Sequence, residues 1–433
     1  MLLAVIICLL TCVSMFASVL FRSTLRLARH QMDTYWMIAL GGVLLLSVFS
    51  KVPWSALLEA VTADNAVNPL KILILFISMT ILSIYLDEFG FFRYLANIAL
   101  LRARTSQRKL FVYLYVTVAV LTVFTSNDII ILSFTPFICF FARNARISPL
   151  PYLSAEFVAA NTWSMALVIG NPTNIYLATA RGVDFMSYLR VMWGPTLAAG
   201  ISAMLLLWFL YRRQLTAPVT GQAEKIVITD RLRLTLGLIH LGVCTVCLVL
   251  SSYIGLEMWL ISGISAISLL LCATLISAVR HERPVGVIAC LNRAPWALIP
   301  FMLSMFVMTL VLTENGLTEK IASLAGQGGT VMKYGLLSFF SSNLLNNIPM
   351  SVLFQAVIDH LPASESLPAV YATVIGSNLG ALLTPTGALA GIMWRSILTA
   401  HGCHFRFADF LKMGTLIGLP ALLAALGSLT LTV

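Results

Sequence analysis

The sequence predicts an all-α polytopic membrane protein made of two inverted-topology repeats, each with five transmembrane helices and one re-entrant hairpin, and with broken helices at the midplane. Of the 433 residues, 59% are hydrophobic and only 10% are charged, and the mean hydropathy is +0.94. Soluble domains carry about 25% charged residues, so these values exclude a soluble fold. Apolar runs of roughly 20 residues, enough to cross about 30 Å of hydrocarbon, recur along the chain. Short motifs of the first half also recur, in order, in the second half.

The apolar runs predict ten spanning helices. They lie at 1–21, 35–50, 67–87, 154–180, 188–211, 232–253, 258–278, 296–313, 368–394 and 409–431. The first run lacks a basic start and a small-residue cleavage motif, so we interpret it as a span and not as a signal peptide.

Two further apolar stretches, 110–143 and 331–358, are too long for one span and too short for two spans with a turn. Each contains a polar centre. We interpret both as re-entrant hairpins, because non-helical backbone at membrane depth is tolerated only where protein surrounds it.

The distribution of positive charge favours the hairpins over crossings. With both termini outside, the cytoplasmic segments would be 22–34, 88–109, 142–153, 212–233, 279–295 and 395–412. These segments hold all the Lys and Arg residues except Lys51, Lys71, Arg181, Arg190, Lys320 and Lys333. Cytoplasmic loops carry such an excess, and it explains the net charge of +10 better than nucleic-acid binding does.

Four motif pairs recur in register. "LDEFGFFRYLA" (86–96) matches "LTENGLTEKIA" (312–322), and "TSN" (125–127) matches "SSN" (341–343). "GNPTN" (170–174) corresponds to "TPTG" (384–387), and "VDF" (183–185) to "ADF" (408–410). The chain therefore divides into an N-terminal repeat at 1–211, a polar cytoplasmic linker at 212–231 and a C-terminal repeat at 232–433. Five crossings per repeat invert the second repeat, an arrangement typical of secondary transporters with a site at the midplane.

The first hairpin has a polar tip, Thr125-Ser126-Asn127-Asp128. These are good N-cap residues, and helix capping is the alternative to a functional role. A helix start also presents free N–H groups to an anion or polar solute. Asp128 is the one acid that the pattern places deep in the bilayer, where it could bind Na⁺ or carry a proton. Glu156, near the start of its helix, is expected to have no special role.

The second hairpin tip and two broken helices complete the predicted substrate and ion site. Gly and Pro interrupt the spans at 154–180 and 368–394, so unwound backbone faces neighbouring groups. The predicted site residues are Ser126, Asn127, Asp128, Asn171, Thr173, Asn174, Ser342, Asn343, Asn346, Asn347, Ser377, Asn378, Thr384 and Thr386.

No motif for hydrolytic or nucleotide-driven chemistry is present, so we do not expect an enzyme. No metal or cofactor is predicted beyond a coupling ion, H⁺ or Na⁺. The eight cysteines show no zinc-type spacing and are interpreted as small apolar packing residues.

The segments "LDEFGFF", "SNDIIILSFTP", "LNNIP" and "YATVIGSNLGALLTPTGALAGIMW" resemble those of ArsB-type arsenite permeases. These belong to the ion-transporter superfamily, with citrate, dicarboxylate and Na⁺/H⁺ carriers. The resemblance implies two hairpins, two broken helices and a transport domain that moves against a scaffold. Asn127 and Asp128, Asn346 and Asn347, and Ser377 and Asn378 match the permease pattern. "GNPTN" departs from it and is closer to the carboxylate branch.

The predicted function is therefore an ion-coupled secondary transporter of the inner (plasma) membrane that exports arsenite or antimonite in exchange for protons. An organic-anion transporter of the citrate or dicarboxylate type, coupled to Na⁺ or H⁺, is the first alternative, and a passive anion channel is the second. A cytoplasmic ATPase subunit could dock on the basic loops at 88–109 and 212–233, and the chain could form a homodimer.

Overall fold

The computed structural model describes residues 2–21, 24–27, 30–49, 52, 54–64, 68–103, 105–216, 218, 227–325, 328–403 and 405–433. Part of the predicted linker at 212–231, namely 217 and 219–226, lies outside these residues, together with Arg104 and His404. The described chain is helical, which confirms the all-α prediction, apart from one antiparallel hairpin of strands β1 (Thr24–Leu27) and β2 (His30–Asp33). The sequence predicted a loop there.

The helices of the first half begin close to the predicted positions. They are α1 (Leu2–Phe21), α2 (Thr34–Phe49), α3 (Trp54–Thr62), α4 (Pro69–Glu88), α5 (Phe91–Ala103), α6 (Gln107–Phe124), α7 (Asn127–Asn144), α8 (Leu150–Trp163), the 3₁₀ turn η1 (Val168–Gly170), α9 (Pro172–Thr179) and α10 (Phe185–Tyr211), followed by the short turn η2 (Gln214–Thr216).

The second half repeats this order of elements. It contains α11 (Arg231–Val249), α12 (Ser251–Ile254), α13 (Met258–Val279), α14 (Val285–Arg293), α15 (Leu298–Glu314), α16 (Leu317–Ala325), α17 (Thr330–Leu345), α18 (Asn347–Ile358), α19 (Ala363–Gly380), α20 (Leu389–Ala400), α21 (Phe407–Met413), the π-helical turn η3 (Gly414–Gly418) and α22 (Leu419–Leu429).

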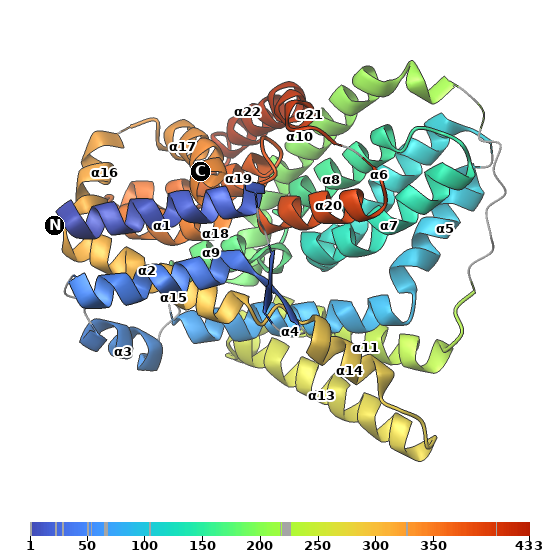
Figure 1. Cartoon of the computed structure of the whole chain (residues 1–433), viewed down its shortest axis with the longest axis horizontal. Helices are drawn as coiled ribbons and strands as arrows, with labels where there is room; N and C mark the ends of the chain where they lie inside the picture. The colour runs from blue at the N-terminus through green and yellow to red at the C-terminus, as the bar shows by residue number, and fades with distance from the viewer. Residues whose placement is uncertain are drawn as a thin grey trace.

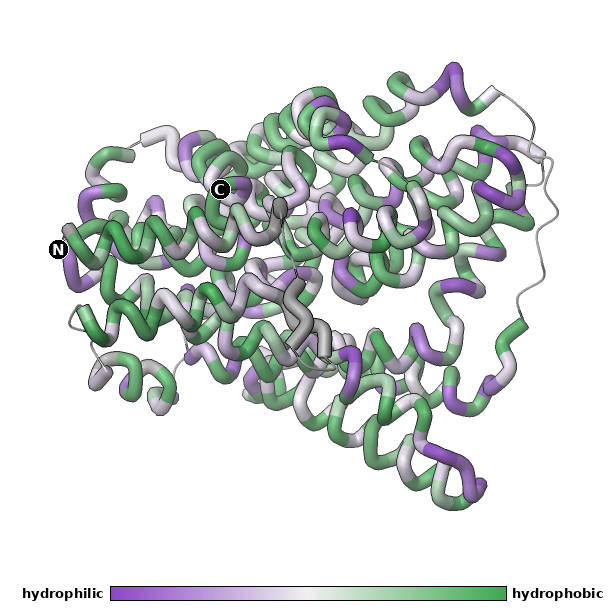
Figure 2. The backbone as a smooth tube through the Cα atoms, viewed as in Figure 1, coloured by the Kyte–Doolittle hydropathy of each residue, from purple (hydrophilic) through white to green (hydrophobic). Residues whose placement is uncertain are grey.

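Seven helices in the described residues are long and apolar enough to cross a membrane. They are Pro69–Glu88, Gln107–Phe124, Phe185–Tyr211, Arg231–Val249, Met258–Val279, Val285–Glu314 and Phe407–Leu429. Shorter apolar helices, such as Thr34–Phe49 and Asn347–Ile358, lie between them. Figure 2 shows apolar residues along nearly all helices, with polar residues gathered at their ends. The chain is a multi-pass membrane protein.

Four short helices were not predicted: α3, α5, α14 and α16. Two of them occupy equivalent places, because α5 follows α4 and α16 follows α15 across the paired motifs at 86–96 and 312–322. Each turn contains a glycine in the left-handed region, Gly90 with φ +78° and Gly316 with φ +71°. Glycine adopts this conformation without steric penalty, so the two motifs encode the same turn. The membrane orientation of the two halves stays a prediction.

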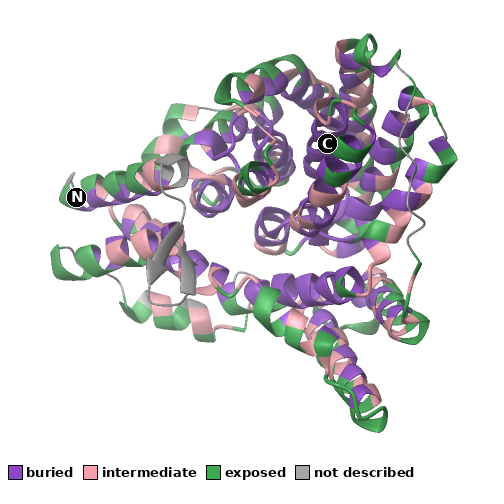
Figure 3. Cartoon of the chain, turned by 45° about the vertical axis from the view of Figure 1, so that its right-hand side comes forward, coloured by how far each residue is buried: buried purple, intermediate pink, exposed green. Residues whose placement is uncertain are grey.

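The two broken helices form the centre of the molecule. Residues 151–162 and 369–382 are buried without exception, and Figure 3 shows this buried interior among more exposed outer helices. Around it, α17 packs along α19, α10 along α22, and α6 along α8. In Figure 1, α4, α11, α13 and α14 form a second group of helices below it, and α1, α2 and α15 lie at the N-terminal side.

Candidate functional site

The first polar tip separates α6 from α7. Thr125 and Ser126 are extended, and α7 begins at Asn127. Ser126 occupies the N-cap position but its side chain makes no capping hydrogen bond. Asn127 Oδ1 instead accepts from the Asp128 backbone N–H at 3.0 Å, and Asn127 Nδ2 donates to Asn161 Oδ1 of α8 at 3.2 Å. The tip is therefore joined to the first broken helix, and capping does not account for Ser126.

The second tip docks on the break between α19 and α20. Asn346 has φ +72°, and its Nδ2 donates to the Thr386 carbonyl at 3.0 Å. The Asn347 N–H donates to the Gly387 carbonyl at 3.0 Å. Thr384 Oγ1 donates to Asn343 Oδ1 at 2.6 Å. The tip therefore provides hydrogen-bond donors for backbone carbonyls that the break in the helix leaves unpaired, as breaks inside a membrane require.

A second set of hydrogen bonds joins the two broken helices to each other. We call Ser164, Asn171, Thr173, Asn174, Ser377 and Asn378 the amide cluster; all six are buried. Asn378 Oδ1 accepts from Ser164 Oγ at 2.8 Å and from Asn171 Nδ2 at 3.0 Å. Asn378 Nδ2 donates to Asn174 Oδ1 at 2.7 Å. Residues more than 200 positions apart thus form one polar core between the halves.

The local sequence builds the first half of this cluster. Gly170 ends η1 with its Cα against the Ser164 carbonyl, where an added Cβ would overlap that oxygen. Asn171 then caps α9 by accepting from the Thr173 N–H at 3.3 Å, and Pro172 occupies the first helical position, where proline is favoured. The break leaves the Asn171 and Asn174 side chains free to reach α19.

The structure divides the predicted site residues into three groups. Asn171, Thr173, Asn174, Ser377 and Asn378 meet in the amide cluster, where Thr173 Oγ1 lies 3.0 Å from Ser377 Oγ. The second group is the docked tip with its break. Its members are Ser342, Asn343, Asn346, Asn347, Thr384 and Thr386.

The first tip, Ser126-Asn127-Asp128, forms the third group and is linked to the amide cluster. Ser164 Oγ has one proton and lies 2.8 Å from Asn378 Oδ1 and 3.0 Å from the Asn161 backbone carbonyl, so it can donate to either oxygen, while the Asn161 side-chain Oδ1 accepts from Asn127 Nδ2. Among the residues that the structure describes, no hydrogen bond joins the docked tip to the amide cluster. The docked tip contacts α19 at Gly380, whose Cα lies against Ser342 Oγ.

Asp128 faces a cavity next to the first tip, and no residue of the amide cluster lines that cavity. This cavity of about 340 Å³ lies between α4, α7, α20 and the segment that joins α14 to α15. Arg293 and Thr80 line it with Asp128, and most of its remaining wall is apolar, including Trp296 and Met393. A cavity of this size and composition suits a small ligand.

Several buried polar atoms near the breaks lack a hydrogen-bond partner. Among the described residues these include Ser126 Oγ, Thr162 Oγ1, Asn347 Oδ1 and Thr373 Oγ1. At least nine in ten buried polar groups in proteins are hydrogen-bonded, so unpaired atoms require an explanation. Two of them belong to predicted tip residues, and two lie within one helical turn of the amide cluster. They provide hydrogen-bonding capacity for a polar solute.

The expectation that Asp128 is the one deeply placed acid was wrong. Glu156 is fully buried in α8, where Thr135 Oγ1 donates to it at 2.7 Å and Trp394 Nε1 at 3.4 Å. It joins α7 of the first half to α20 of the second. Its position inside the apolar run "SAEFVAA" was the signal that could have identified it.

Sequence reasoning also missed an ion pair across the cavity. Asp87, near the end of α4, accepts from Ser133 Oγ of α7 at 2.5 Å and from Arg293 Nη2 at 2.5 Å. The Asp87 side chain is 4% exposed and that of Arg293 is 35% exposed. Arg293 is the last residue of α14, and its ion pair therefore joins α4 to the wall of the cavity that contains Asp128. No sequence motif marks this pairing.

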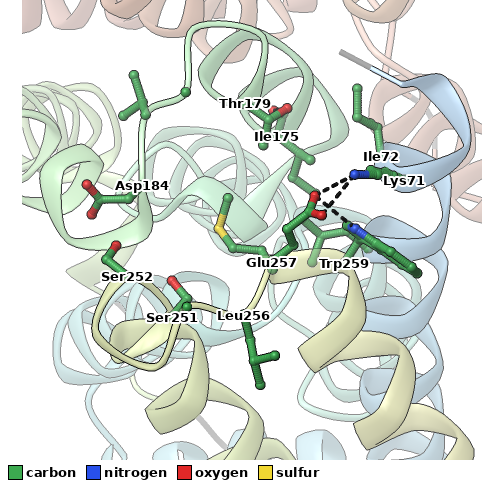
Figure 4. Close-up of a pocket in the computed structure, with 15 residues that line it drawn as sticks. Lys71, Ile72, Ile175, Thr179, Asp184, Ser251, Ser252, Leu256, Glu257 and Trp259 are labelled. Carbon is green, nitrogen blue, oxygen red and sulfur yellow. Dashed lines mark hydrogen bonds and ion pairs between the residues drawn. The ribbon is translucent and has the colours of Figure 1, made fainter. Parts of the chain in front are cut away.

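A second cavity, of about 320 Å³, lies away from all the predicted site residues. It is bounded by the start of α4, the turn after α9 and the start of α13 (Figure 4). Glu257 accepts from Lys71 at 2.7 Å and from Trp259 Nε1 at 3.0 Å. Asp184 on the opposite wall caps α10 through the Met186 and Ser187 N–H groups, both at 2.9 Å. The ion pair of Lys71 with Glu257 joins the start of α4 to the start of α13. We therefore interpret this wall of the cavity as a structural contact between the two helices.

No group of three or more His, Cys, Asp or Glu side chains suited to a metal ion occurs within the described parts of the chain. Around the predicted site the geometry instead offers amides, hydroxyls and the carboxylate of Asp128, which lines the first cavity. Such a set can bind a polar solute or a monovalent ion without covalent chemistry.

Comparisons with known proteins show which proteins this chain is similar to. The chain is 28% identical over 408 residues to the arsenical pump membrane protein of Escherichia coli K12, covering 88% of this chain and 93% of that protein. It is 27% identical to the arsenical pump membrane protein of Yersinia enterocolitica, over 82% and 85% of the two chains. A putative arsenical pump membrane protein of Bacillus subtilis strain 168 is 25% identical, over 78% and 82%.

The solved structure of the Alcanivorax borkumensis YdaH transporter has the same fold, with a TM-score of 0.57 at 15% identity and coverage of 99% and 97%. These findings confirm the resemblance to arsenite permeases within the ion-transporter superfamily, and the chain is a membrane transporter. A model of the citrate transporter family matches residues 33–376, most of the sequence. This chain belongs to that citrate transporter (CitMHS) family.

Proposed function

We propose that this protein is a secondary transporter that exports trivalent arsenic and antimony hydroxides in exchange for protons. The observation that carries the proposal is the amide cluster, where every hydrogen-bonding group that meets across the halves is an amide or a hydroxyl. Arsenite and antimonite are neutral hydroxides near pH 7. Donors and acceptors of this kind match them without a fixed positive charge. The names of the relatives support the same substrate class.

Asp128 is proposed as the coupling carboxylate. It lines the cavity next to the first tip, and it lies one residue from Asn127, which is hydrogen-bonded to Asn161. A carboxyl group in this place can take up a proton from one side and release it on the other. The link from Asn127 through Asn161 and Ser164 to Asn378 connects its protonation to the geometry of the amide cluster.

A second candidate function is transport of an organic anion coupled to Na⁺ or H⁺. Arg293 favours it, because its guanidinium lines the same cavity as Asp128. A guanidinium pairs well with a substrate carboxylate. The description of the matching family supports this alternative. For that function Arg293 would have to exchange Asp87 for the substrate.

Flux into everted membrane vesicles separates the two. We expect arsenite to accumulate when the vesicle lumen is made acidic, and citrate to accumulate little under the same pH gradient or an imposed Na⁺ gradient. Vesicles containing the Asp128→Asn variant are the matched control for coupling. Citrate accumulation without arsenite accumulation would contradict the first proposal and support the second. Downhill flux that is unaffected by either gradient would indicate a passive channel and contradict both.

A further inference from the structure

Two cysteines from opposite halves of the chain meet at the end of the bundle that contains Arg143. Cys139 lies in α7, and Cys403 follows α20. Their Sγ atoms are 3.5 Å apart, and both are free thiols. Cys139 is 2% exposed, whereas Cys403 is partly exposed. No sequence motif pairs them, because 264 positions separate them.

Backbone contacts fix the segment that presents Cys403. The Cys403 N–H donates to the Leu398 carbonyl of α20 at 2.8 Å. Gly402 has φ +70°, the turn conformation that brings Cys403 back toward the helix. Arg143, one turn beyond Cys139 in α7, donates from Nη2 to the His401 carbonyl at 2.5 Å. Hydrogen bonds from this turn to α20 and from Arg143 of α7 to the turn therefore hold the two thiols next to each other.

We infer that Cys139 and Cys403 form a dithiol site for trivalent arsenicals, distinct from the amide cluster and going beyond the proposed function. A trivalent arsenic centre is a soft Lewis acid, and thiol sulfur is the side-chain ligand that soft centres prefer. One arsenic atom bonded to two sulfurs holds them close to the contact distance seen here. The preformed pair therefore requires little rearrangement to bind.

The reaction balances without an oxidant. Each S–H bond breaks as an As–S bond forms, and the thiol proton leaves with a hydroxyl group of the arsenical as water. Two thiols and one arsenic dihydroxide give one cyclic dithioarsenite and two water molecules, and arsenic remains trivalent. Partial exposure of Cys403 gives the reagent access, and Cys139 then closes the chelate from the buried side.

Among the described residues, no other pair of cysteine Sγ atoms lies within hydrogen-bonding distance. Cys244 Sγ contacts Met79 Sδ at 3.8 Å, and Cys290 Sγ lies 3.5 Å from the Ile81 carbonyl. Cys244 and Cys247 share one helix, α11. Substitution of these two gives a matched control that removes a pair of nearby thiols but leaves the inferred site.

Occupation of the site would connect the two halves covalently. α7 begins at the first tip, with Asn127 and Asp128, and Cys139 lies towards its other end. α20 begins directly after the break to which the second tip docks, and Cys403 follows its end. A bound arsenical would therefore restrain any movement of α7 relative to α20. We expect it to slow transport of every substrate.

The test uses purified full-length protein in detergent with phenylarsine oxide, under anaerobic conditions, and counts free thiols. In a variant whose other six cysteines are Ser, one equivalent is expected to remove both remaining thiols, and 2,3-dimercaptopropanol is expected to restore them. Intact mass should rise by one phenylarsine oxide less one water molecule. The Cys244→Ser/Cys247→Ser variant should keep this tight equivalent, and the Cys139→Ser/Cys403→Ser variant should lose it.

Equal binding by the Cys139→Ser/Cys403→Ser variant, or loss of both thiols with a mass lower by two hydrogens and no arsenical, would overturn the inference. The second result would show that the pair forms only a disulfide. Arsenite flux in vesicles is measured in parallel. Flux that persists without dithiol binding refutes only this site, whereas dithiol binding without arsenite flux refutes only the proposed transport function.

Discussion

Truncation of Asn378 to Ala removes the side chain that makes three hydrogen bonds from α19 to the first half. Its side chain is fully buried and makes three hydrogen bonds to Ser164, Asn171 and Asn174. Side-chain hydrogen bonds between membrane helices contribute on average about 0.6 kcal/mol, with a maximum of about 1.7. Three such bonds, together with the cavity left by the amide, give an expected loss of about 2–4 kcal/mol in the free energy of unfolding.

Equilibrium unfolding of the purified protein in mixed micelles measures this loss. Asn315→Ala is the matched control, because Asn315 Nδ2 donates only to the Val311 carbonyl of its own helix and should contribute under about 1 kcal/mol. A double-mutant cycle of Asn378→Ala with Asn174→Ala should give a coupling energy of about 1 kcal/mol, because the 2.7 Å bond joins them directly. Coupling within about 0.3 kcal/mol of zero would refute the contact between the halves.

Three further variants probe the cavity and the packing around the site. Asp128→Asn should reduce proton-driven arsenite accumulation at least about tenfold while downhill flux persists, as measured in everted vesicles; unchanged accumulation would exclude Asp128 as the coupling group. Arg293→Gln should reduce the free energy of unfolding by about 1–3 kcal/mol, because it leaves the Asp87 carboxylate buried without its ion partner. Adding Asp87→Asn should restore most of that loss, and a double variant no more stable than the single one would contradict the pairing. Gly376→Ala should lower the free energy of unfolding by about 1–3 kcal/mol or more in the same assay, because the added Cβ would overlap Ser338 Oγ. Gly427→Ala is the control, because nothing lies within 4 Å of its added Cβ, and it should change stability little.

The fold was largely predictable from the sequence because the bilayer restricts what an apolar chain can form. Apolar runs of about 20 residues identify spans by length alone, and polar residues at 125–128 and 341–347 identify the interruptions. The short helices α5 and α16 were missed because their apolar residues merge with flanking loops of mixed composition. The strands β1 and β2 were missed because four-residue strands carry almost no period-two signal.

The candidate site was predicted as a set of residues but not as an arrangement. Repeated motifs indicated that 170–174 and 384–387 correspond, but the hydrogen bond of Asn171 goes to Asn378, which lies before the second motif. The sequence could not indicate that Asp128 and Arg293 line the same cavity, because this arrangement depends on how α14 packs against α4. Nor could it assign Glu156, whose burial depends on Trp394 of a helix more than 230 positions away.

The polar core between the two halves requires Thr173 and Ser377 to lie in contact. Disulfide trapping tests this contact directly in native membranes, with Thr173→Cys and Ser377→Cys introduced into a chain whose other cysteines are Ser. Their hydroxyl oxygens are 3.0 Å apart, so we predict rapid cross-linking within one chain. A pair of Thr179→Cys with Ser377→Cys serves as the control that should not cross-link. Failure of the first pair to form a disulfide would contradict the contact between the halves.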